Sequence, residues 1–598
     1  MCGIMGYIGK ADRAGAIALR GLQRQEYRGY DSWGMVVFGP DNLVKEKHVG
    51  RIQRAHFDGP VASAAGSLAI GHTRWATHGA VTEDNCHPHF SCDGRIAVVH
   101  NGIIENYDAL RIHLETLGHR FRSETDSEVI PHLIEENLKA TNLVESVAAT
   151  LHALNGTFAL IIAVQGQREL IVARHGSPMI IGLGDGETFI ASDLAGFLDH
   201  TNKAIFLDDG EMAFVGEEVR VMNYFTGRTE EREAREIKWK ADAISKGDHD
   251  HFMHKEIHEQ PDAITRTIEA DGQLDGITSQ GIDRIILVAC GSAWYAGMVG
   301  RYMFEQFARI PVEVDHASEF RYRDPIIGER DLVIAITQSG ETIDTLEAVR
   351  EAKRKGARTL GICNVRDSTI ARESDQVFYT QAGPEIGVAS TKAFNCQLVA
   401  QFMIALRFAR ERGMLAEAEV AGLRGELGKV PGLIDAVLVD EPVIVDLAKT
   451  YCHQTNFLYA GRGVNFGIAM EGALKLKETS YIHAEGMSAA ELKHGAIALI
   501  DNDMPSVFIA VRDGTYQKVI NNMQEVKSRG GRIITIANDR DEKIGAVSDH
   551  IFFVPDGIEH LLPCLTVVPL QLLAYHIARL RGCDVDKPRN LAKCVTVE

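Results

Sequence analysis

Residues 331–356 read DLVIAITQSGETIDTLEAVREAKRKG and set out the repeating unit of the second half of the chain. The run from Asp331 to Ile336 is short and apolar, which predicts a buried strand. The segment after Gly340 has the pattern of a helix, and we expect Ser339 to cap its start and Gly356 to end it. A strand that leads through a short loop into a helix is typical of a doubly wound parallel α/β sheet.

The same pattern occurs twice after Pro261. ESDQVFYT (373–380) matches VSDHIFFV (547–554), and Asn364 of TLGICNVRD matches Asn538 of ITIANDRD. The offset, which is the number of positions from a residue to its match, is the same for both pairs. DLVIAITQSG and SVFIAVRDG end at Gly340 and Gly514, which keep this offset, while RIILVACG aligns with TNFLYAGRG at a slightly shorter one. Several segments at one offset indicate two tandem copies of one α/β domain.

Residues 1 to about 240 have a different pattern. Short apolar runs such as SWGMVVF, TFALIIAVQG and ELIVARHG are bounded by Gly, Asp or Asn, and helical stretches such as Tyr107–Leu117 are fewer. This pattern predicts an α+β layered domain. We therefore expect one domain over 1–240, a linker over 241–260, the two α/β copies over 261–430 and 431–582, and a tail over 583–598.

The composition is that of a multidomain globular protein of 598 residues, 45% of them hydrophobic. A net charge of −19 argues against nucleic acid as the main partner, because phosphate backbones require a basic surface. The ten cysteines are scattered without a CxxC pair, which favours reduced thiols in the cytoplasm. The sequence shows neither a signal peptide nor an apolar run long enough to span a membrane, so we expect no membrane association.

Small polar side chains gather in the loop after DLVIAIT and in two other loops of the first α/β copy. Such residues at a helix start can bind a phosphate dianion without a lysine, although a capped helix without a ligand is the alternative. In the second copy Asp513 stands in place of the loop serine and would repel phosphate. The predicted phosphate site therefore consists of Ser292, Thr337, Gln338, Ser339, Thr342 and Ser390.

The second copy carries candidate acid–base residues instead. Glu471, Lys475 and Glu478 are spaced to share one helix face, and the apolar residues around them suggest partial burial. The alternative is an ordinary exposed salt-bridge stripe. His494, in ELKHG, is a candidate proton shuttle. Lys593, in the terminal NLAKCVTVE, could enter a site with the tail, but this signal is weak by itself.

MCGIMGYIG at the start raises the question of a nucleophile. If Met1 is removed, Cys2 becomes the first residue, and its own α-amine can act as the base for the thiol. A buried thiol in a strand is the alternative. Other clusters contain residue types that recognise an α-amino acid and an oxyanion, namely Arg74, Thr77 and His78, Asn101 and Gly102, and Asp126.

These motifs resemble known families in a specific order. MCGI, EYRGYDS, HTRWATHG, HNGIIEN and SETDSE look like the N-terminal-nucleophile (Ntn) glutaminase domain of class II glutamine amidotransferases. TQSGET, EIGVASTKAF, ALKLKE, AELKHG and PRNLAKCVTVE resemble paired sugar-isomerase (SIS) domains. Together they are similar, nearly end to end, to the family of isomerizing glutamine–fructose-6-phosphate aminotransferases.

The resemblance implies a glutaminase site in the first domain. Cys2 attacks the side-chain amide of glutamine, and Trp75 gates a channel that carries the released ammonia. Asn101 and Gly102 stabilise the oxyanion. The amino-acid end of glutamine is held by Arg74 and Asp126, with Thr77 and His78 close by.

The resemblance also implies a fructose 6-phosphate site that makes glucosamine 6-phosphate. Lys593 forms a Schiff base with the ketose, Glu478 moves the proton between C1 and C2, and Lys475 assists. His494 opens the sugar ring from the neighbouring subunit, which implies a homodimer. The pocket is completed by Val388, Ala592 and the phosphate-binding residues. Ala293 and Cys594 depart from the usual family pattern by replacing a hydroxyl residue and a serine.

Cofactors and metals are not expected. HDHFMHKEIHE (249–259) and CHPHFSC (86–92) contain metal-ligand residue types, but no regular ligand framework encloses them. Three alternative functions remain open: an amidotransferase with another acceptor, a paralogue acting on another ketose phosphate, and a catalytically dead sugar-phosphate sensor. The first lacks its expected acidic diphosphate or SGGxDS motif. The last predicts loss of Glu478, Lys593 or His494, and all three residues are present.

Overall fold

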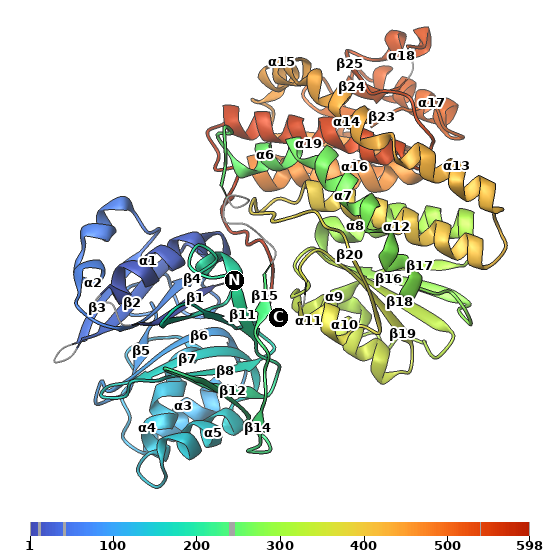
Figure 1. Ribbon diagram of the computed structural model, residues 1–598. Helices are drawn as coiled ribbons and strands as arrows, with labels where there is room; N and C mark the ends of the chain where they lie inside the picture. Colours follow the sequence, from blue (N-terminus) through green and yellow to red (C-terminus); the bar gives the residue numbers. More distant parts are fainter. Residues whose placement is uncertain are drawn as a thin grey trace. The chain divides into compact units, whose positions relative to one another are not determined.

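The computed structural model describes residues 2–9, 13–39, 43–237, 245–366, 368–538 and 540–596. The chain divides into two compact units. Unit 1 contains Met1–Ile244 together with Ala592–Glu598, and unit 2 contains Ser245–Leu591. Each unit is described by itself below (Figure 1).

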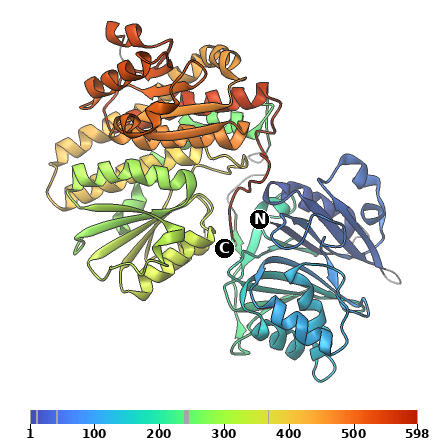
Figure 2. The ribbon, with the colours of Figure 1, turned by 180° about the vertical axis from the view of Figure 1, so that it is seen from behind.

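Unit 1 is built from two antiparallel sheets, with helices on the outer face of each (Figures 1 and 2). The first sheet has the order β15 (Arg235–Glu236), β11 (Lys203–Phe206), β9 (Ile180–Leu183), β10 (Glu187–Ala191), β1 (Gly3–Gly9), β4 (Leu68–Arg74), β2 (Ser32–Phe38), β3 (Leu43–Val49). The second has the order β14 (Thr229–Glu230), β13 (Val219–Asn223), β12 (Glu211–Val215), β8 (Leu170–His175), β7 (Gly156–Val164), β6 (Ile96–Ile104), β5 (His89–Phe90). The helices are α1 (Ala14–Arg24) and α2 (Pro60–Ser63) by the first sheet, and α3 (Tyr107–Thr116), α4 (Val129–Asn137) and α5 (Leu143–Ala153) by the second.

Strand alternation explains these layers. Along β1, Ile4 points into an apolar core shared by the two sheets, and the next residue, Met5, packs with Leu19 and Leu22 of α1. Both faces of β1 are therefore buried, which is why its sequence reads as a continuous apolar run. A third cluster fills the space between the second sheet and its helices. The predicted α+β layered domain is confirmed, and α3 agrees with the predicted helix.

Unit 2 contains two five-stranded parallel sheets. The first is ordered β17 (Val312–His316), β16 (Arg284–Ala289), β18 (Asp331–Ile336), β19 (Arg358–Cys363), β20 (Gln376–Tyr379). The second is ordered β22 (His483–Ser488), β21 (Asn456–Gly461), β23 (Pro505–Ile509), β24 (Arg532–Ala537), β25 (His550–Phe553). Both orders are 2-1-3-4-5 within their copy, so the two predicted doubly wound domains are confirmed.

The constant offset of the sequence repeat recurs in three dimensions. The same offset separates the first residues of β18 and β23, 331 and 505, of β19 and β24, 358 and 532, and of β20 and β25, 376 and 550. Asp375 accepts the amide of Thr359 at 2.9 Å, and Asp549 accepts that of Ile533 at 2.8 Å. The aspartate of the repeated SD pair therefore makes the same contact in both copies. It lies just before the last strand of the sheet and binds the start of the neighbouring strand.

Helices cover both sheets and join the copies into one unit. The first copy has α8 (Gly291–Met303), α9 (Ala317–Phe320), α10 (Ile343–Arg354), α11 (Thr369–Glu373) and α12 (Lys392–Glu411), followed by α13 (Glu417–Leu427) and α14 (Val430–Val439). The second has α15 (Glu441–Tyr451), α16 (Val464–Ser480), α17 (Tyr516–Lys527), α18 (Glu542–Val547) and α19 (Leu562–Leu580), and α6 (Phe252–His258) and α7 (Gln260–Glu269) precede both. One apolar core includes Leu287 and Phe402 of the first copy and Ile468 and Leu572 of the second.

Helix α19 is the only described helix that is long and apolar enough to cross a membrane. Of its most apolar stretch, 94% is buried inside the protein. Its side chains therefore serve the shared core of unit 2.

The start of α10 differs from the prediction. The helix begins at Ile343, so Thr342 is the residue before it, and Ser339 lies earlier in the loop. Ser339 Oγ accepts the amide of Glu341 at 3.1 Å, and Gly340 turns the chain with φ of +68°. The prediction that Ser339 caps this helix is wrong, because the turn at Gly340 adds residues between strand and helix. Gly356, with φ of +81°, follows the helix as predicted.

Candidate active sites

The Cys2 thiol lies at the start of β1, where the adjacent strand β4 ends. Cys2 Sγ accepts the amide hydrogen of Trp75 at 3.2 Å. Burial raises the pKa of the thiol, and the Trp75 amide and the nearby Arg74 and Arg28 guanidinium groups offset this only in part. A thiol with a raised pKa needs a base to become a nucleophile, and the use of its own α-amine as that base stays a prediction.

Asn101 on β6 joins the second sheet to this cysteine. Its Nδ2 donates to the carbonyl oxygen of Cys2 at 3.0 Å, and Arg28 Nε donates to the same oxygen at 3.3 Å. Asn101 Oδ1 lies 3.1 Å from His72 Nε2. Because an amide oxygen only accepts, Nε2 must carry the proton, and burial lowers the pKa of His72 to about 3. A neutral His72 thus holds the Asn101 amide with its NH₂ toward Cys2.

Gly102 and Asp126 lie next to Asn101 in space. Gly102 has φ of +134°, and a Cβ there would come within 1.9 Å of the Thr157 carbonyl oxygen, so only glycine fits. Asp126, in the short helix η3 (Asp126–Glu128), accepts the amide of Ile104 at 2.8 Å. The residues predicted to bind an oxyanion and an ammonium are therefore brought to one end of β6.

Arg74 organises the loop that follows β4. Its guanidinium donates to the carbonyl oxygens of His78, Gly79 (3.1 Å) and Ala80 (3.0 Å). Thr77 is exposed, and His78 packs edge-on against Tyr107 at 5.5 Å. The structure thus brings Asn101 into contact with Cys2. Binding of glutamine by Arg74, Thr77, His78 and Asp126 stays a prediction.

Unit 2 brings Ser292 of the first copy onto the acid–base helix of the second. Ser292 lies in the first turn of α8, while Lys475 lies in the C-terminal half of α16. Lys475 Nζ donates to Ser292 Oγ at 3.0 Å and to Glu478 Oε2 at 2.8 Å. The two helices pack closely, since a Cβ on Gly467 would lie 3.0 Å from the side chain of Val299. A site formed by both copies results.

The charges on α16 are buried. The side chains of Glu471 and Lys475 are 0% exposed and that of Glu478 is 18% exposed. Desolvation raises the pKa of Glu471 to about 7, although Lys475 Nζ lies 3.4 Å from its Oε1. Burial lowers the pKa of Lys475, but the two glutamates outweigh it and raise the value. The alternative of an exposed salt-bridge stripe is wrong, and the cluster has the burial of an acid–base centre.

The predicted phosphate loop follows β18. Thr337 is 4% exposed, and its Oγ1 accepts the amide of Gly340 at 3.1 Å. The main chain of Gln338 accepts the amide of Asn364 at 3.2 Å, which fixes the loop against the end of β19. Strands β16 and β18 are neighbours although β17 lies between them in sequence, so Ser292 and this loop flank the switch point of the sheet.

Ser390 and Val388 lie in the segment before α12. Glu385 organises this segment, because its carboxylate accepts the amides of Thr391 (2.9 Å) and Ala393 (3.0 Å) and the Ser390 hydroxyl (3.4 Å). The amide of Val388 donates to the carbonyl of Asp586 at 3.0 Å. Glu385 also contributes to the electrostatic environment of Lys475. The segment is therefore held both by the Glu385 carboxylate and by the hydrogen bond from Val388 to Asp586.

The remaining predicted residues are His494, Ala592 and Lys593. His494 ends the short helix η8 (Ala489–His494) and is exposed. Ala592 and Lys593 belong to unit 1, where the neighbouring Cys594 and Thr596 are buried. A role for Lys593 beside Glu478 stays a prediction.

Three structurally important residues were missed by sequence reasoning. His72 orients Asn101, Glu385 caps α12, and Asp586 accepts the amides of Phe252 (3.0 Å) and Met253 (2.9 Å) at the start of α6. His72 lies inside HTRWATHG and Glu385 begins EIGVASTKAF. The sequence motifs therefore identified the right segments but not these two residues. Nothing in the local sequence of Asp586 predicts a partner so far away along the chain.

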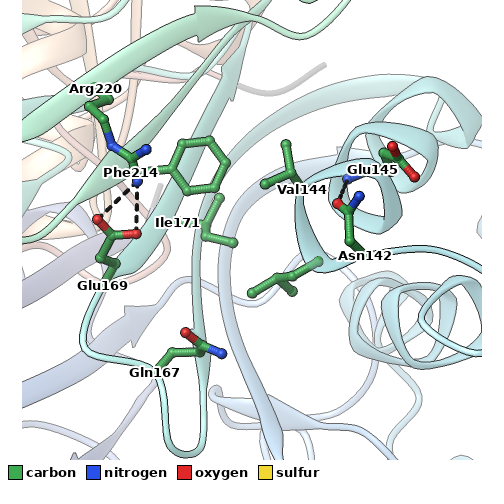
Figure 3. Close-up of a pocket in the computed structure, with 9 residues that line it drawn as sticks. Asn142, Val144, Glu145, Gln167, Glu169, Ile171, Phe214 and Arg220 are labelled. Carbon is green, nitrogen blue, oxygen red and sulfur yellow. Dashed lines mark hydrogen bonds and ion pairs between the residues drawn. The ribbon is translucent and has the colours of Figure 1, made fainter.

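A pocket in unit 1 contains none of the predicted site residues (Figure 3). Two interactions join polar groups of its lining: Arg220 binds both oxygens of Glu169, at 3.0 and 3.1 Å, and Asn142 accepts the amide of Glu145 at the start of α5. We assign it no function.

Comparisons with known proteins agree with this geometry. A model of the SIS domain matches residues 280–407 and 451–581, and a model of a glutamine amidotransferase domain matches residues 72–199. The fold and site thus define an enzyme with a glutamine amidotransferase domain followed by two SIS domains. Relatives named glutamine–fructose-6-phosphate aminotransferase [isomerizing] from Thermus thermophilus and Aquifex aeolicus are 48% and 47% identical over 100% of both chains. The chain belongs to this family.

Solved structures match unit 2. The C-terminal domain of glucosamine-fructose-6-phosphate aminotransferase from Francisella tularensis is 39% identical with a TM-score of 0.54, and the match covers 57% of this chain and 100% of that one. A protein described as a putative tagatose-6-phosphate ketose/aldose isomerase from Clostridium novyi is 17% identical, covers 57% and 93%, and has a TM-score of 0.51. The latter similarity concerns the fold alone.

Proposed function

We propose that this enzyme converts fructose 6-phosphate and glutamine into glucosamine 6-phosphate and glutamate. The observation that carries this proposal is the contact of Lys475 Nζ with Ser292 Oγ and Glu478 Oε2. This contact joins Lys475 and Glu478 of the second copy to Ser292 of the first, which supports a shared site for proton transfer and phosphate binding. A ketose–aldose isomerisation requires this combination of anchoring and proton transfer.

In the glutaminase half, the Cys2 thiolate adds to the amide carbon of glutamine. The Asn101 NH₂ and the Gly102 amide stabilise the developing oxyanion. Ammonia leaves, a thioester to Cys2 remains, and water releases glutamate and regenerates the thiol. Arg74 binds the α-carboxylate and Asp126 the α-ammonium group, with Thr77 and His78 bordering the site.

In the sugar half, the phosphate is anchored by Ser292 and the loop after β18. His494 opens the ring, and Lys593 activates the ketose carbonyl as a Schiff base that ammonia displaces at C2. Glu478, held by Lys475, removes the proton from C1 and delivers it to C2, which leaves the aldose. Val388, Ser390 and Ala592 line the sugar pocket, and Trp75 gates the passage of ammonia.

The same proposal includes a homodimer in the cytoplasm. His494 is exposed on η8 and is therefore available to a second copy of the chain. Mixing Glu478→Gln subunits with His494→Gln subunits by co-expression should restore activity that neither variant has alone. If mixed dimers form but stay inactive, His494 does not act across subunits.

The test of the reaction uses two nitrogen sources. Cys2→Ala should abolish glutamine-dependent synthesis and leave synthesis from high ammonia, because only the first site uses the thiol. Product analysis with fructose 6-phosphate and glutamine identifies the amino sugar. Retained glutaminase activity in Cys2→Ala contradicts the nucleophile assignment, and a product formed only from another ketose phosphate contradicts the acceptor.

A further inference from the structure

Four residues with metal-ligating side chains, none of them among the predicted site residues, converge in unit 1. Cys92 lies in the turn between β5 and β6, and His119 lies in the segment after α3. His132 and Glu135 are three positions apart on one face of α4. One ligand atom from each of the four lies within 4.8 Å of the others.

The distances are those of a coordination polyhedron. Cys92 Sγ lies 3.7 Å from His119 Nδ1 and 3.6 Å from His132 Nδ1, and the two nitrogens are 3.3 Å apart. Glu135 Oε2 lies 3.2 Å from His119 Nδ1 and 3.6 Å from His132 Nδ1. A tetrahedral zinc ion with ordinary Zn–S, Zn–N and Zn–O bonds separates its ligand atoms by about 3.3–3.7 Å.

The surroundings orient the ligands. His119 Nε2 lies 2.8 Å from Glu136 Oε2, and His132 Nε2 lies 3.7 Å from Glu128 Oε1, so a carboxylate stands behind each imidazole. The 2.8 Å contact with Glu136 fixes the orientation of the His119 ring. The amide of Arg120 donates to Cys92 Sγ at 3.4 Å, which suits a thiolate.

We propose that Cys92, His119, His132 and Glu135 bind a structural Zn²⁺ ion. The mixed sulfur, nitrogen and oxygen donors favour zinc over magnesium or calcium, which prefer oxygen alone. Four protein ligands close the tetrahedron, so the ion holds chain segments together and takes no part in the reaction. The expectation of no metal in CHPHFSC rested on irregular local spacing, and only Cys92 of that stretch belongs to this cluster.

The bound ion would support the predicted glutamine site. It links the β5–β6 turn and the segment after α3 to α4, which follows η3 directly. Glu128 of η3, behind His132, also accepts the amides of Arg122 (2.9 Å) and Ser123 (2.7 Å). Asp126 lies in the same short helix, so the metal restrains the segment that presents its carboxylate.

Metal analysis of the full chain tests the proposal. Protein purified with added zinc and then dialysed should contain one zinc per chain. Cys92→Ser and Glu135→Gln should each reduce this content at least tenfold, whereas Cys583→Ser, a half-buried cysteine of unit 2, should leave it unchanged. Cobalt substituted for zinc should give a thiolate-to-metal absorption band in the near ultraviolet that Cys92→Ser loses and Cys583→Ser keeps.

Three outcomes overturn the assignment. The first is wild-type protein that retains no zinc after dialysis. The four side chains would then be held together by hydrogen bonds without a metal ion. The second is full zinc content in folded Cys92→Ser and Glu135→Gln. The third is zinc that is lost in His576→Gln instead, which would place the ion at the His254, Glu441 and His576 group of unit 2.

Discussion

The two SIS copies share a fold but differ at the same loop. In the first copy Ser339 follows β18, and in the second Asp513 takes the equivalent place after β23. The Asp513 carboxylate accepts the amide and hydroxyl of Thr515, at 2.7 and 2.8 Å, and the amide of the Asn465 side chain at 3.1 Å. The second copy thus carries its own anion where the first has neutral hydroxyls.

The helix that follows the first strand of each copy, α8 after β16 and α16 after β21, shows the opposite distribution. Helix α16 carries Glu471, Lys475 and Glu478, whereas α8 reads GSAWYAGMVGRYM and has no charge before Arg301. On α16, Gly467 lies where the two helices approach each other, against Tyr295 and Val299 of α8. Duplication therefore allowed a division of labour, with the phosphate predicted in one copy and the proton-transfer groups in the other.

Lys475→Met should have the largest effect, because Lys475 is the contact between the copies. We expect kcat with ammonia as nitrogen source to fall roughly 10³-fold, as is typical for loss of a group that assists proton transfer. Lys477→Met, at an exposed position of the same helix, is the matched control and should keep full activity. Equal losses in both variants would mean that the helix itself had been disturbed.

Ser339→Asp converts the loop of the first copy to the chemistry of the second. A carboxylate against a phosphate dianion costs several kcal/mol, so KM for fructose 6-phosphate should rise about 100-fold. Glutamine hydrolysis measured alone should change little. An unchanged KM would show that the phosphate binds elsewhere.

Glu471→Gln should change the pH dependence of stability. The carboxyl has a pKa of about 7 in the folded protein and 4.5 ordinarily, so the unfolded state releases its proton first as pH rises. The contribution of this carboxyl to the free energy of unfolding is therefore fully present below pH 4.5. It decreases by roughly 3 kcal/mol as the pH rises to about 7. Thermal unfolding at pH 5 and pH 7.5 should show a smaller difference in Glu471→Gln than in the wild type. The same difference in both proteins contradicts the raised pKa.

Asp513→Ala should have the smallest effect. The variant loses the hydrogen bonds to Thr515 at the start of α17, which stabilise by about 1 kcal/mol. Denaturant unfolding should show this loss, and KM for fructose 6-phosphate should stay unchanged because the phosphate is predicted to bind in the first copy. A raised KM would contradict the division between the copies.

Local sequence was sufficient for the fold class and for some of the elements, and it supplied the candidate site residues. The apolar run from Asp331 to Ile336 predicted strand β18, since burial on both faces of a parallel sheet leaves a continuous apolar pattern, and the constant offset of the repeat predicted the second α/β copy. Motifs with mechanistic meaning located Cys2, Asn101 and Lys475. The capping residue of α10 was not predictable, because the turn at Gly340 is decided by the loop conformation.

The sequence by itself determined the fold class, the duplication and the residue types available for chemistry, because these depend on periodicity and composition along the chain. Only the tertiary structure decided which distant residues meet. The contact of Lys475 with Ser292, the orientation of Asn101 by His72, and the convergence of Cys92 with His119, His132 and Glu135 all join separate elements. Burial also decided the protonation of Glu471, because its desolvation comes from the packed surroundings rather than from its neighbours in sequence.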